Sequence, residues 1–213
     1  MIYDFSNLPS QDRYRLLSNF VGPRPVALIT TRDAEGRANA APMSFFNVFS
    51  HDPAIVAVGI QDRPDGRTKD TMANLRATGE FTAHMVDLPM AEAMLICGLD
   101  LPPEIDELAA AGLASRSGEK TNAPVIETAP VAMECRVERM IEWPERAIIL
   151  GEVVSMHIRP DCFAPGGRYA NPETFQPIAR LHADNYIVAD RQFELVAPDR
   201  DAVLKAALAQ TCG

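Results

Sequence analysis

Short runs of apolar and β-branched residues recur along the chain, and each run has the length of a β-strand. The runs at residues 24–31 and 54–60 are almost continuously apolar, which predicts buried strands. Residues 131–143 instead alternate, with apolar positions such as Cys135 separated by charged positions such as Glu134. This period of two predicts a strand with one face toward the core and the other toward water.

Three further runs complete a predicted set of about six strands. They are residues 37–45, 80–87 and 147–158. Turn-forming residues separate several neighbouring runs, which predicts hairpins between them. Pro42 assigns its strand to an edge or a bulge, because proline has no N–H to donate to a ladder.

Helical patterns follow the third and fourth of these strands. Residues 70–79 predict a helix with Asp70 as its N-cap and Gly79 as its C-cap. Further helices are predicted at residues 88–99, 103–113 and 200–210. Because helices do not alternate regularly with strands, the pattern disfavours a doubly wound parallel sheet and favours a small closed barrel. We expect residues 1–213 to form a single, mainly β domain.

One polar pattern fits neither a strand nor a helix. Within residues 39–53, Ser44, Asn47 and Ser50 recur at every third position among phenylalanines. A half-buried strand alternates at every second position, and an amphipathic helix has a period of about 3.6 residues. We interpret this stretch as an irregular segment. In this interpretation Pro42 interrupts the ladder and frees backbone donors.

Charge narrows the possible partners. A net charge of −9 argues against a general nucleic-acid binder, which needs a positive surface. The same charge gives no attraction to anionic membranes, and no apolar run has transmembrane length. The first residues lack the pattern of a secretory signal. We therefore expect a cytoplasmic protein without nucleic-acid or membrane partners.

The residues that most often carry catalysis are scattered. The four histidines are isolated, and the sequence lacks the glycine-rich, zinc-protease and nucleophile-elbow motifs. The four cysteines form no CxxC pair, so they predict reduced thiols rather than a zinc site or redox dithiol. They are Cys97, Cys135, Cys162 and Cys212. We expect no metal site and assign no catalytic side chain.

The junction between a polar loop and the predicted helix at residue 70 gives one positive chemical signal. Helix N-termini direct unpaired N–H groups outward and therefore bind phosphate. Lys69 adds a positive charge there, and Thr71 adds a hydroxyl donor. Asp70 is negative and could simply cap the helix, which is the commoner role at such a junction.

Residues 23–86 carry an ordered set of short motifs. These are Arg-Pro-Val, Thr-Thr, Asn-x-Ala-Pro-x-Ser-x-Phe-Asn, Asp-Pro, Lys-Asp-Thr and Thr-Gly-Glu-Phe. As a set they resemble the flavin reductase-like family of FMN-binding split β-barrels. The resemblance continues loosely to residues 177–186, whereas the helical middle at residues 88–112 carries little of it.

The resemblance implies a Greek-key split β-barrel that forms a homodimer, with FMN near the subunit interface. It implies cofactor contacts at Thr30 and Thr31 beside the ring, at Ala41, Pro42, Met43, Ser44, Phe46 and Asn47 along the ring and ribityl chain, and at Lys69, Asp70 and Thr71 around the phosphate. Two alternatives stay open. Ser44 and Asn47 could instead bond local backbone at a bulge, and Thr30 and Thr31 could be ordinary strand residues.

The C-terminal part departs from the family pattern. Members usually carry Arg-Leu-Gly-Gly-x-x-Tyr, whereas this chain has His182 and Ala183 in place of the glycine pair, between Arg180 and Tyr186. Glycines allow close approach of the backbone, so the replacements put the usual nicotinamide site in doubt more than FMN binding. Arg180, His182 and Tyr186 are candidates for a substrate or nicotinamide pocket. Arg180 could equally form an ion pair between subunits.

The resemblance implies an FMN-dependent oxidoreductase, with NADH or NADPH as the co-substrate that reduces the flavin. The electrons would pass to free flavin or to a partner monooxygenase. Three alternatives remain: direct reduction of a small organic substrate, a non-enzymatic FMN electron carrier, and a barrel that binds no flavin and serves as a structural or ligand-binding module.

Overall fold

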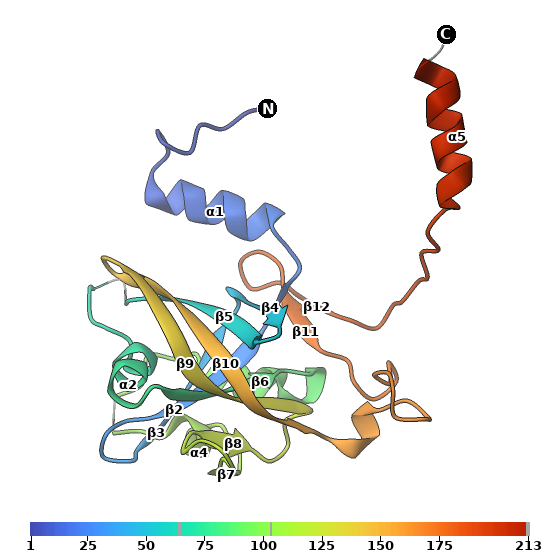
Figure 1. Cartoon of the computed structure of the whole chain (residues 1–213). Coiled ribbons are helices and arrows are strands. Elements are labelled where there is room, and N and C mark those ends of the chain that lie inside the picture. Colours follow the sequence, from blue (N-terminus) through green and yellow to red (C-terminus); the bar gives the residue numbers. More distant parts are fainter. Residues whose placement is uncertain (64, 103, 212–213) are drawn as a thin grey trace.

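One antiparallel sheet of seven strands forms the body of the molecule, in the order β3-β2-β6-β9-β10-β5-β4. A computed structural model describes residues 1–63, 65–102 and 104–211. The seven strands are β2 (Ala27–Arg32), β3 (Ala38–Met43), β4 (Phe46–His51), β5 (Ala54–Gln61), β6 (Glu80–Met85), β9 (Val131–Trp143) and β10 (Arg146–Ile158). The sheet curls into a barrel, with the long β9–β10 hairpin crossing its front (Figure 1), which confirms the mainly β prediction.

The two edges of this sheet are joined by a very short connection. Strands β3 and β4 lie at opposite ends of the strand order, yet only Ser44 and Phe45 separate them in sequence. So short a segment spans only about 10 Å, so the sheet must curl until its edges meet. At this crossing the Gly59 N–H donates to the Phe45 carbonyl over 2.7 Å. We call residues 43–46 the seam.

The backbone of residues 39–53 is more regular than the irregular segment that the sequence predicted. The β2–β3 ladder continues through Pro42, which pairs with Leu28, so the predicted interruption is wrong. The edge placement of Pro42 is confirmed. Ala40 turns its N–H toward the open edge, and Pro42 lies two positions further on the same side. No ladder bond is therefore lost at the proline.

The period-three pattern lies mostly on regular strand, so the predicted irregular segment is wrong, whereas the ligand contacts of its side chains stay predictions. Ser44 lies in the seam, whereas Asn47 and Ser50 belong to strand β4. The register between β4 and β5 shifts between Val48 and Ser50, where a bulge inserts an extra residue. The crossing and the bulge together displace the polar positions from strict alternation.

The helix predicted at residue 70 is present as α2 (Asp70–Thr78). Gly79 ends it with a φ of 69°, so the predicted C-cap is confirmed. The predicted N-cap is wrong by one position, because Lys69 precedes the helix and Asp70 is its first residue. The Asp70 carboxylate instead pairs with Arg63 over 2.8 Å.

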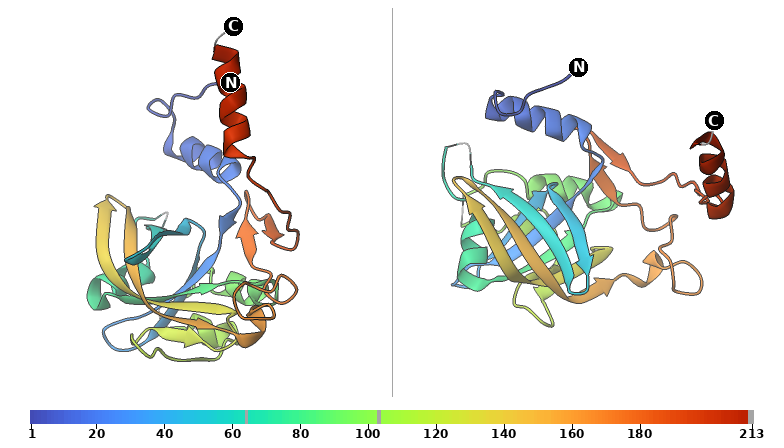
Figure 2. Two further views of the ribbon diagram at one scale, coloured as in Figure 1. Left: turned by 45° about the vertical axis from the view of Figure 1, so that its right-hand side comes forward. Right: turned by 45° about the horizontal axis from the view of Figure 1, so that its top comes forward.

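The other helices match the sequence less closely. The middle segment forms only short helices: η1 (Leu88–Met90), α3 (Ala91–Ile96) and α4 (Glu107–Ala110). Pro103, where the second of these helices was predicted to begin, lies outside the described residues. The tail helix is confirmed as α5 (Arg200–Thr211), and it projects away from the barrel (Figures 1 and 2). Within the described ranges, no helix is long and apolar enough to cross a membrane.

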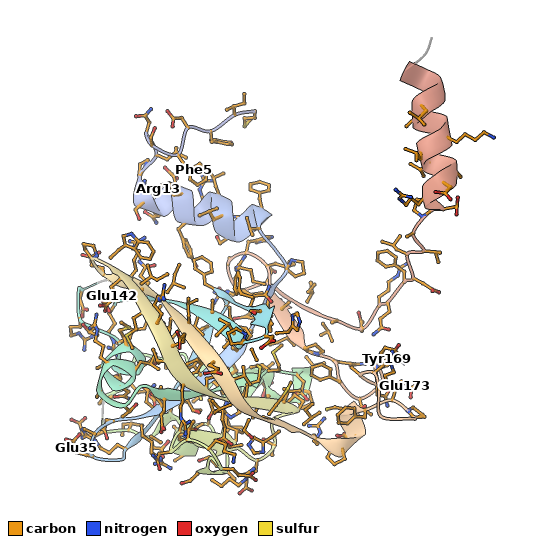
Figure 3. The ribbon with its side chains drawn as sticks, in the orientation of Figure 1. Phe5, Arg13, Glu35, Glu142, Tyr169 and Glu173 are labelled. Atoms are coloured by element: carbon orange, nitrogen blue, oxygen red, sulfur yellow. The ribbon has the colours of Figure 1, made fainter. Side chains whose placement is uncertain are left out.

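An N-terminal helix, α1 (Ser10–Phe20), was not predicted and lies over one end of the barrel (Figure 3). The segment before it folds back, because Arg13 donates to the Phe5 carbonyl over 3.4 Å. Arg24 secures the end of the helix by donating to the carbonyl groups of Ser18 and Val21. A cation here also favours the negative end of the helix dipole.

Two small sheets complete the fold. Strands β1 (Arg24–Pro25), β11 (Ile178–Arg180) and β12 (Tyr186–Val188) form the first, and β7 (Ser115–Ser117) and β8 (Pro124–Ile126) form the second. A short helix, η2 (Pro160–Cys162), follows β10. Among the cysteines, Cys97, Cys135 and Cys162 are buried free thiols, and Cys212 lies outside the described residues.

The water-facing side predicted for β9 is partly wrong, because Glu134 is fully buried. The segment that carries β7 and β8 covers this face of the sheet. The Glu134 carboxylate accepts the backbone N–H groups of residues 119, 120 and 121, and it also contacts His157 Nε2 over 2.6 Å. These bonds outweigh burial and lower the pKa of Glu134 to about 2.

Replacing this carboxylate should loosen the covering segment. In Glu134→Gln, the amide NH₂ would face backbone donors, so we expect the free energy of unfolding at pH 7 to fall by about 3 kcal/mol. Because the folded-state pKa is depressed, the contribution of Glu134 is present above the ordinary glutamate pKa and is lost as the pH falls toward 2. Urea denaturation at several pH values measures both effects. Glu138→Gln, an exposed change on the same strand, is the control, and equal losses in both variants would contradict the assignment.

Candidate functional site

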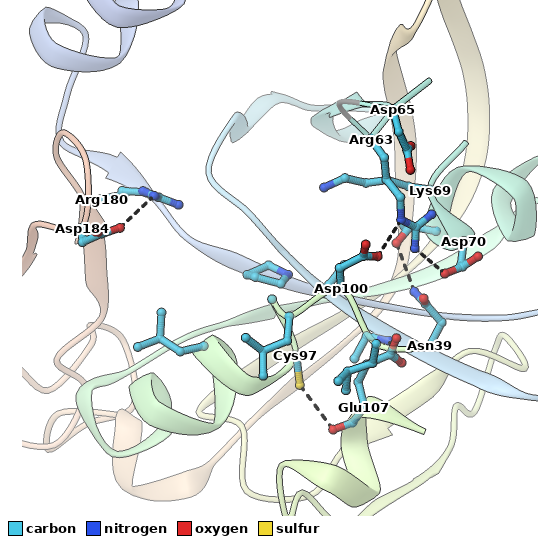
Figure 4. Close-up of a pocket in the computed structure, with 18 of the residues that line it drawn as sticks. Asn39, Arg63, Asp65, Lys69, Asp70, Cys97, Asp100, Glu107, Arg180 and Asp184 are labelled. Atoms are coloured by element: carbon cyan, nitrogen blue, oxygen red, sulfur yellow. Dashed lines mark hydrogen bonds and ion pairs between the residues drawn. The ribbon is translucent and has the colours of Figure 1, made fainter. Parts of the chain in front are cut away.

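A cavity of about 550 Å³ opens beside strand β3 and the start of α2 (Figure 4). Its walls come from β3, the loop before α2, the segment after α3, and the strands near the C-terminus. The lining residues are Asn39, Ala40, Ala41, Pro42, Arg63, Asp65, Lys69, Asp70, Thr71, Leu95, Cys97, Gly98, Leu99, Asp100, Leu101, Glu107, Arg180, Asp184 and Tyr186. Its volume is in the range of small-molecule sites.

A buried amide fixes the start of α2 against the barrel. Asn39 Nδ2 donates to Thr71 Oγ1 over 3.0 Å and lies 3.4 Å from Thr31 Oγ1. Asn74 Nδ2 also donates to Thr31 Oγ1, over 3.0 Å. All four residues are buried, and the network joins β2, β3 and α2 through direct side-chain contacts. Since Thr71 Oγ1 accepts from Asn39, its hydroxyl hydrogen is left for another acceptor.

Lys69 places a positive charge at this end of the cavity. Its side chain is partly buried, and among the described residues no carboxylate forms an ion pair with it. Burial lowers the pKa of the Lys69 amine, and the nearby Arg63 lowers it further. Arg63 is itself paired with Asp70 over 2.8 Å and with Asp100 over 3.0 Å. Of the described cations that line the cavity, Lys69 is therefore the one without an ion pair, and it is available to an anionic ligand.

The apolar floor of the cavity is strand β3. Ala41 and Pro42 line it, and Gly98 packs closely against Pro42. A Cβ at residue 98 would lie 3.2 Å from the Pro42 Cγ, so a larger residue would press on the floor. Leu95 and Leu99 add apolar walls from either side of Gly98.

The C-terminal candidates lie across the cavity from Lys69 (Figure 4). The Arg180 guanidinium lies 5.6 Å from the centre of the Tyr186 ring and 3.9 Å from the Asp184 carboxylate. His182 does not line this cavity. Ala183 adopts a φ of 48°, so it keeps a backbone conformation that favours the glycine it replaces.

The structure separates the predicted cofactor residues into three groups. The first group lines the cavity just described: Ala41, Pro42, Lys69, Asp70 and Thr71. The second group, Ser44, Phe46 and Asn47, lines another cavity of about 510 Å³ beyond the seam. The third group, Thr30, Thr31 and Met43, is buried in the barrel, where the Thr30 hydroxyl donates to the Pro124 carbonyl. These cofactor roles therefore stay predictions.

Sequence reasoning missed several residues that shape the cavity. Asn39 is the first residue of the Asn-x-Ala-Pro-x-Ser-x-Phe-Asn motif, but it was assigned no role from the sequence. A buried amide must find hydrogen-bond partners, and here Asn39 donates to Thr71. Arg63 and Asp100 are distant in sequence and meet only in the fold. Glu107 lines the cavity from α4, and no pattern in the sequence distinguished it from surface carboxylates.

Comparisons with known proteins place these features in context. Residues 21–176 match the family model described as "Flavin reductase like domain". Component B of nitrilotriacetate monooxygenase from Bacillus cereus is 32% identical with a TM-score of 0.85, over 92% of this chain and 98% of that one. The 2-nitrobenzoate 2-nitroreductase of Pseudomonas fluorescens is 32% identical with a TM-score of 0.84, over 94% of this chain and 98% of that one.

A more distant structure supports the architecture alone. A protein from Shewanella frigidimarina with a split barrel domain has a TM-score of 0.78 at 18% identity, over 93% of this chain and 100% of that one. Together with the curled sheet whose edges meet at the seam, this likeness confirms the split β-barrel prediction.

Proposed function

Because the chain belongs to the flavin reductase-like family, we propose that it is an FMN-dependent oxidoreductase that uses NADH or NADPH to reduce flavin. The observation that carries this proposal is the partly buried, unpaired Lys69 beside the Thr71 hydroxyl, in a cavity with apolar walls. When bound, FMN would supply the hydride-accepting and electron-transferring chemistry. The protein would bind, orient and shield it.

The residues present fit the two ends of FMN. Lys69, Thr71 and the N–H groups at the start of α2 form a phosphate site with charge, hydroxyl and backbone donors. Pro42, Leu99 and Tyr186 add apolar surface to the same cavity, which suits the flavin ring. In this arrangement Asn39 acts through Thr71, because it fixes the hydroxyl oxygen and leaves the hydrogen for the phosphate.

Two acceptors of the electrons are favoured by relatives. Component B of a monooxygenase supports transfer of reduced flavin, or of electrons, to a partner monooxygenase. The 2-nitrobenzoate reductase supports a second candidate, in which a small organic molecule is reduced directly. The Arg180 side of the cavity is where either a nicotinamide or such a substrate would enter, because it lies opposite the phosphate end.

We also propose that the protein acts as a homodimer. Apolar side chains are exposed on α1 and on the edge strand β4, including Phe20, Val48 and Phe49. A second copy would cover them and the unpaired edge of β4. Light scattering should report twice the mass of the chain, and Phe49→Glu should shift the protein toward the monomer. A monomer at all concentrations would contradict this proposal.

Removing the free cation should separate phosphate recognition from ring recognition. In Lys69→Ala we expect FMN affinity to fall between about tenfold and about a hundredfold, because a charge-assisted hydrogen bond is lost. Riboflavin has no phosphate, so its affinity should change by less than about threefold. Quenching of flavin fluorescence measures both constants. Lys120→Ala, an exposed lysine elsewhere, is the control, and equal weakening of FMN and riboflavin would exclude the phosphate contact.

The rate of NADH or NADPH oxidation distinguishes the proposed reductase from the alternative functions. With catalytic FMN, the protein should oxidise NADH or NADPH, and excess free FMN should accelerate the reaction if flavin is the acceptor. Acceleration by a nitro-aromatic acid instead would favour direct substrate reduction. Nicotinamide oxidation that does not exceed the rate with FMN alone would reject the reductase. Tight FMN binding without turnover would leave the electron carrier as the function.

A further inference from the structure

Glu107 is a carboxyl group at the cavity wall that neither the resemblance nor the proposed phosphate contacts assign. It lies at the start of α4, in the middle segment that carries little of the family resemblance. Only 9% of the residue is exposed, yet it lines the cavity. Its Oε2 accepts the Ala40 N–H over 3.2 Å, on the open edge of β3. Figure 4 shows it on the same side of the cavity as Asn39.

The described groups in contact with Glu107 carry no positive charge, although Lys69 and Arg63 line the same cavity. On its own element, Asp106 is a second carboxylate and caps α4 by accepting two N–H groups. From α2, Asp70 adds a further negative charge, which its ion pair with Arg63 reduces. Just after α3, the Cys97 thiol lies 3.6 Å from the Glu107 carbonyl oxygen. Strand β3 contributes only the Ala40 N–H. Among the described residues, no cation forms an ion pair with Glu107.

This environment disfavours the ionised carboxylate. Burial raises the pKa of Glu107 above the ordinary glutamate value, the Ala40 N–H opposes that shift, and Asp70 and Asp106 reinforce it. A phosphate monoester carries a charge of about −1.5 to −2 near neutral pH. Entry of such a group beside Lys69 would add a third source of negative potential near Glu107.

We propose that Glu107 takes up a proton when a phosphate-bearing flavin enters the cavity, so that binding of the ligand and protonation of this carboxyl group are coupled. This inference rests on the proposed function, which puts the phosphate beside Lys69 and Thr71. The protonated carboxyl keeps one oxygen as acceptor for the Ala40 N–H and gains an O–H donor. A ribityl hydroxyl is the ligand group that such a donor would meet on the edge of β3.

The coupling has a definite direction. Protonation removes a negative charge next to an anionic ligand, so the ligand-bound protein holds this proton more tightly than the free protein does. FMN affinity should therefore increase as the pH falls, by up to about tenfold per pH unit between the free and bound titrations of Glu107. At pH values below the one at which Glu107 titrates in the free protein, the affinity no longer rises, because the carboxyl group is already protonated before the ligand binds.

Calorimetry in buffers of different ionisation enthalpy counts the protons taken up on binding. The titrations use full-length protein with FMN and with riboflavin, from about pH 5 to about pH 8. The FMN phosphate also titrates near pH 6, and Lys69 near the site can exchange protons, so the informative quantity is wild type minus Glu107→Gln. Gln keeps the shape and a donor but cannot titrate. Glu104→Gln, an exposed change in the same segment, is the matched control.

The expected difference for FMN is an uptake of up to about one proton at its maximum, and Glu104→Gln should behave as wild type. Riboflavin should show a much smaller difference, because it brings no phosphate charge. Equal uptake by wild type and Glu107→Gln would overturn the coupling while leaving FMN binding intact. No binding of FMN by any of these proteins would instead overturn the proposed function. If Glu107→Gln does not fold, an NMR titration of the Glu107 carboxyl carbon in labelled wild type, with and without FMN, tests the same coupling. The carboxyl group should stay protonated to a higher pH with FMN bound, and an unchanged titration would overturn the proposal.

Discussion

The closure of the barrel at residues 43–46 is the constraint on which the rest of the structure depends. The two edge strands of a seven-stranded sheet are consecutive in sequence, so the sheet cannot lie open. Closure brings β3 beside the other edge, but it leaves the outer side of β3 without a partner strand. That unpaired backbone is where the cavity forms, and Pro42 is tolerated there because its missing N–H would have faced the opening.

A second set of contacts, made by buried polar side chains, places a positive charge beside this edge of β3. The side chain of Asn39 joins β3 to the start of α2, so the helix terminus and the free Lys69 keep a fixed place relative to the strand. Polar bonds of this kind are strong in a buried setting, because neither partner can turn to water instead. Barrel closure leaves the edge of β3 exposed, and the Asn39 contact then holds the positive N-terminus of α2 against that edge.

The sequence predicted the parts of the fold that depend on local pattern. The strands, the Gly79 terminus and the tail helix follow from periodicity and backbone preference. It failed where tertiary contacts decide. Glu134 alternates like a surface residue but is covered by a distant segment, and Glu107 reaches the cavity only because its helix packs beside β3. Motif order indicated Lys69 and Thr71, whereas no local signal indicated that Ser44 and Asn47 would line a different cavity.

The wall of the cavity that packs beside β3 belongs to one long connection between β6 and β9, which also covers the outside of the barrel. The barrel closes through other strands. The connection packs on it through an apolar cluster that includes Leu28, Met94 and Leu108, and its backbone also donates hydrogen bonds to the buried side chains of Glu134 and His84. The connection therefore supplies part of the buried core as well as one wall of the cavity. A substitution that reshapes this wall also alters the packing that stabilises the fold, so the two properties are not free to vary independently.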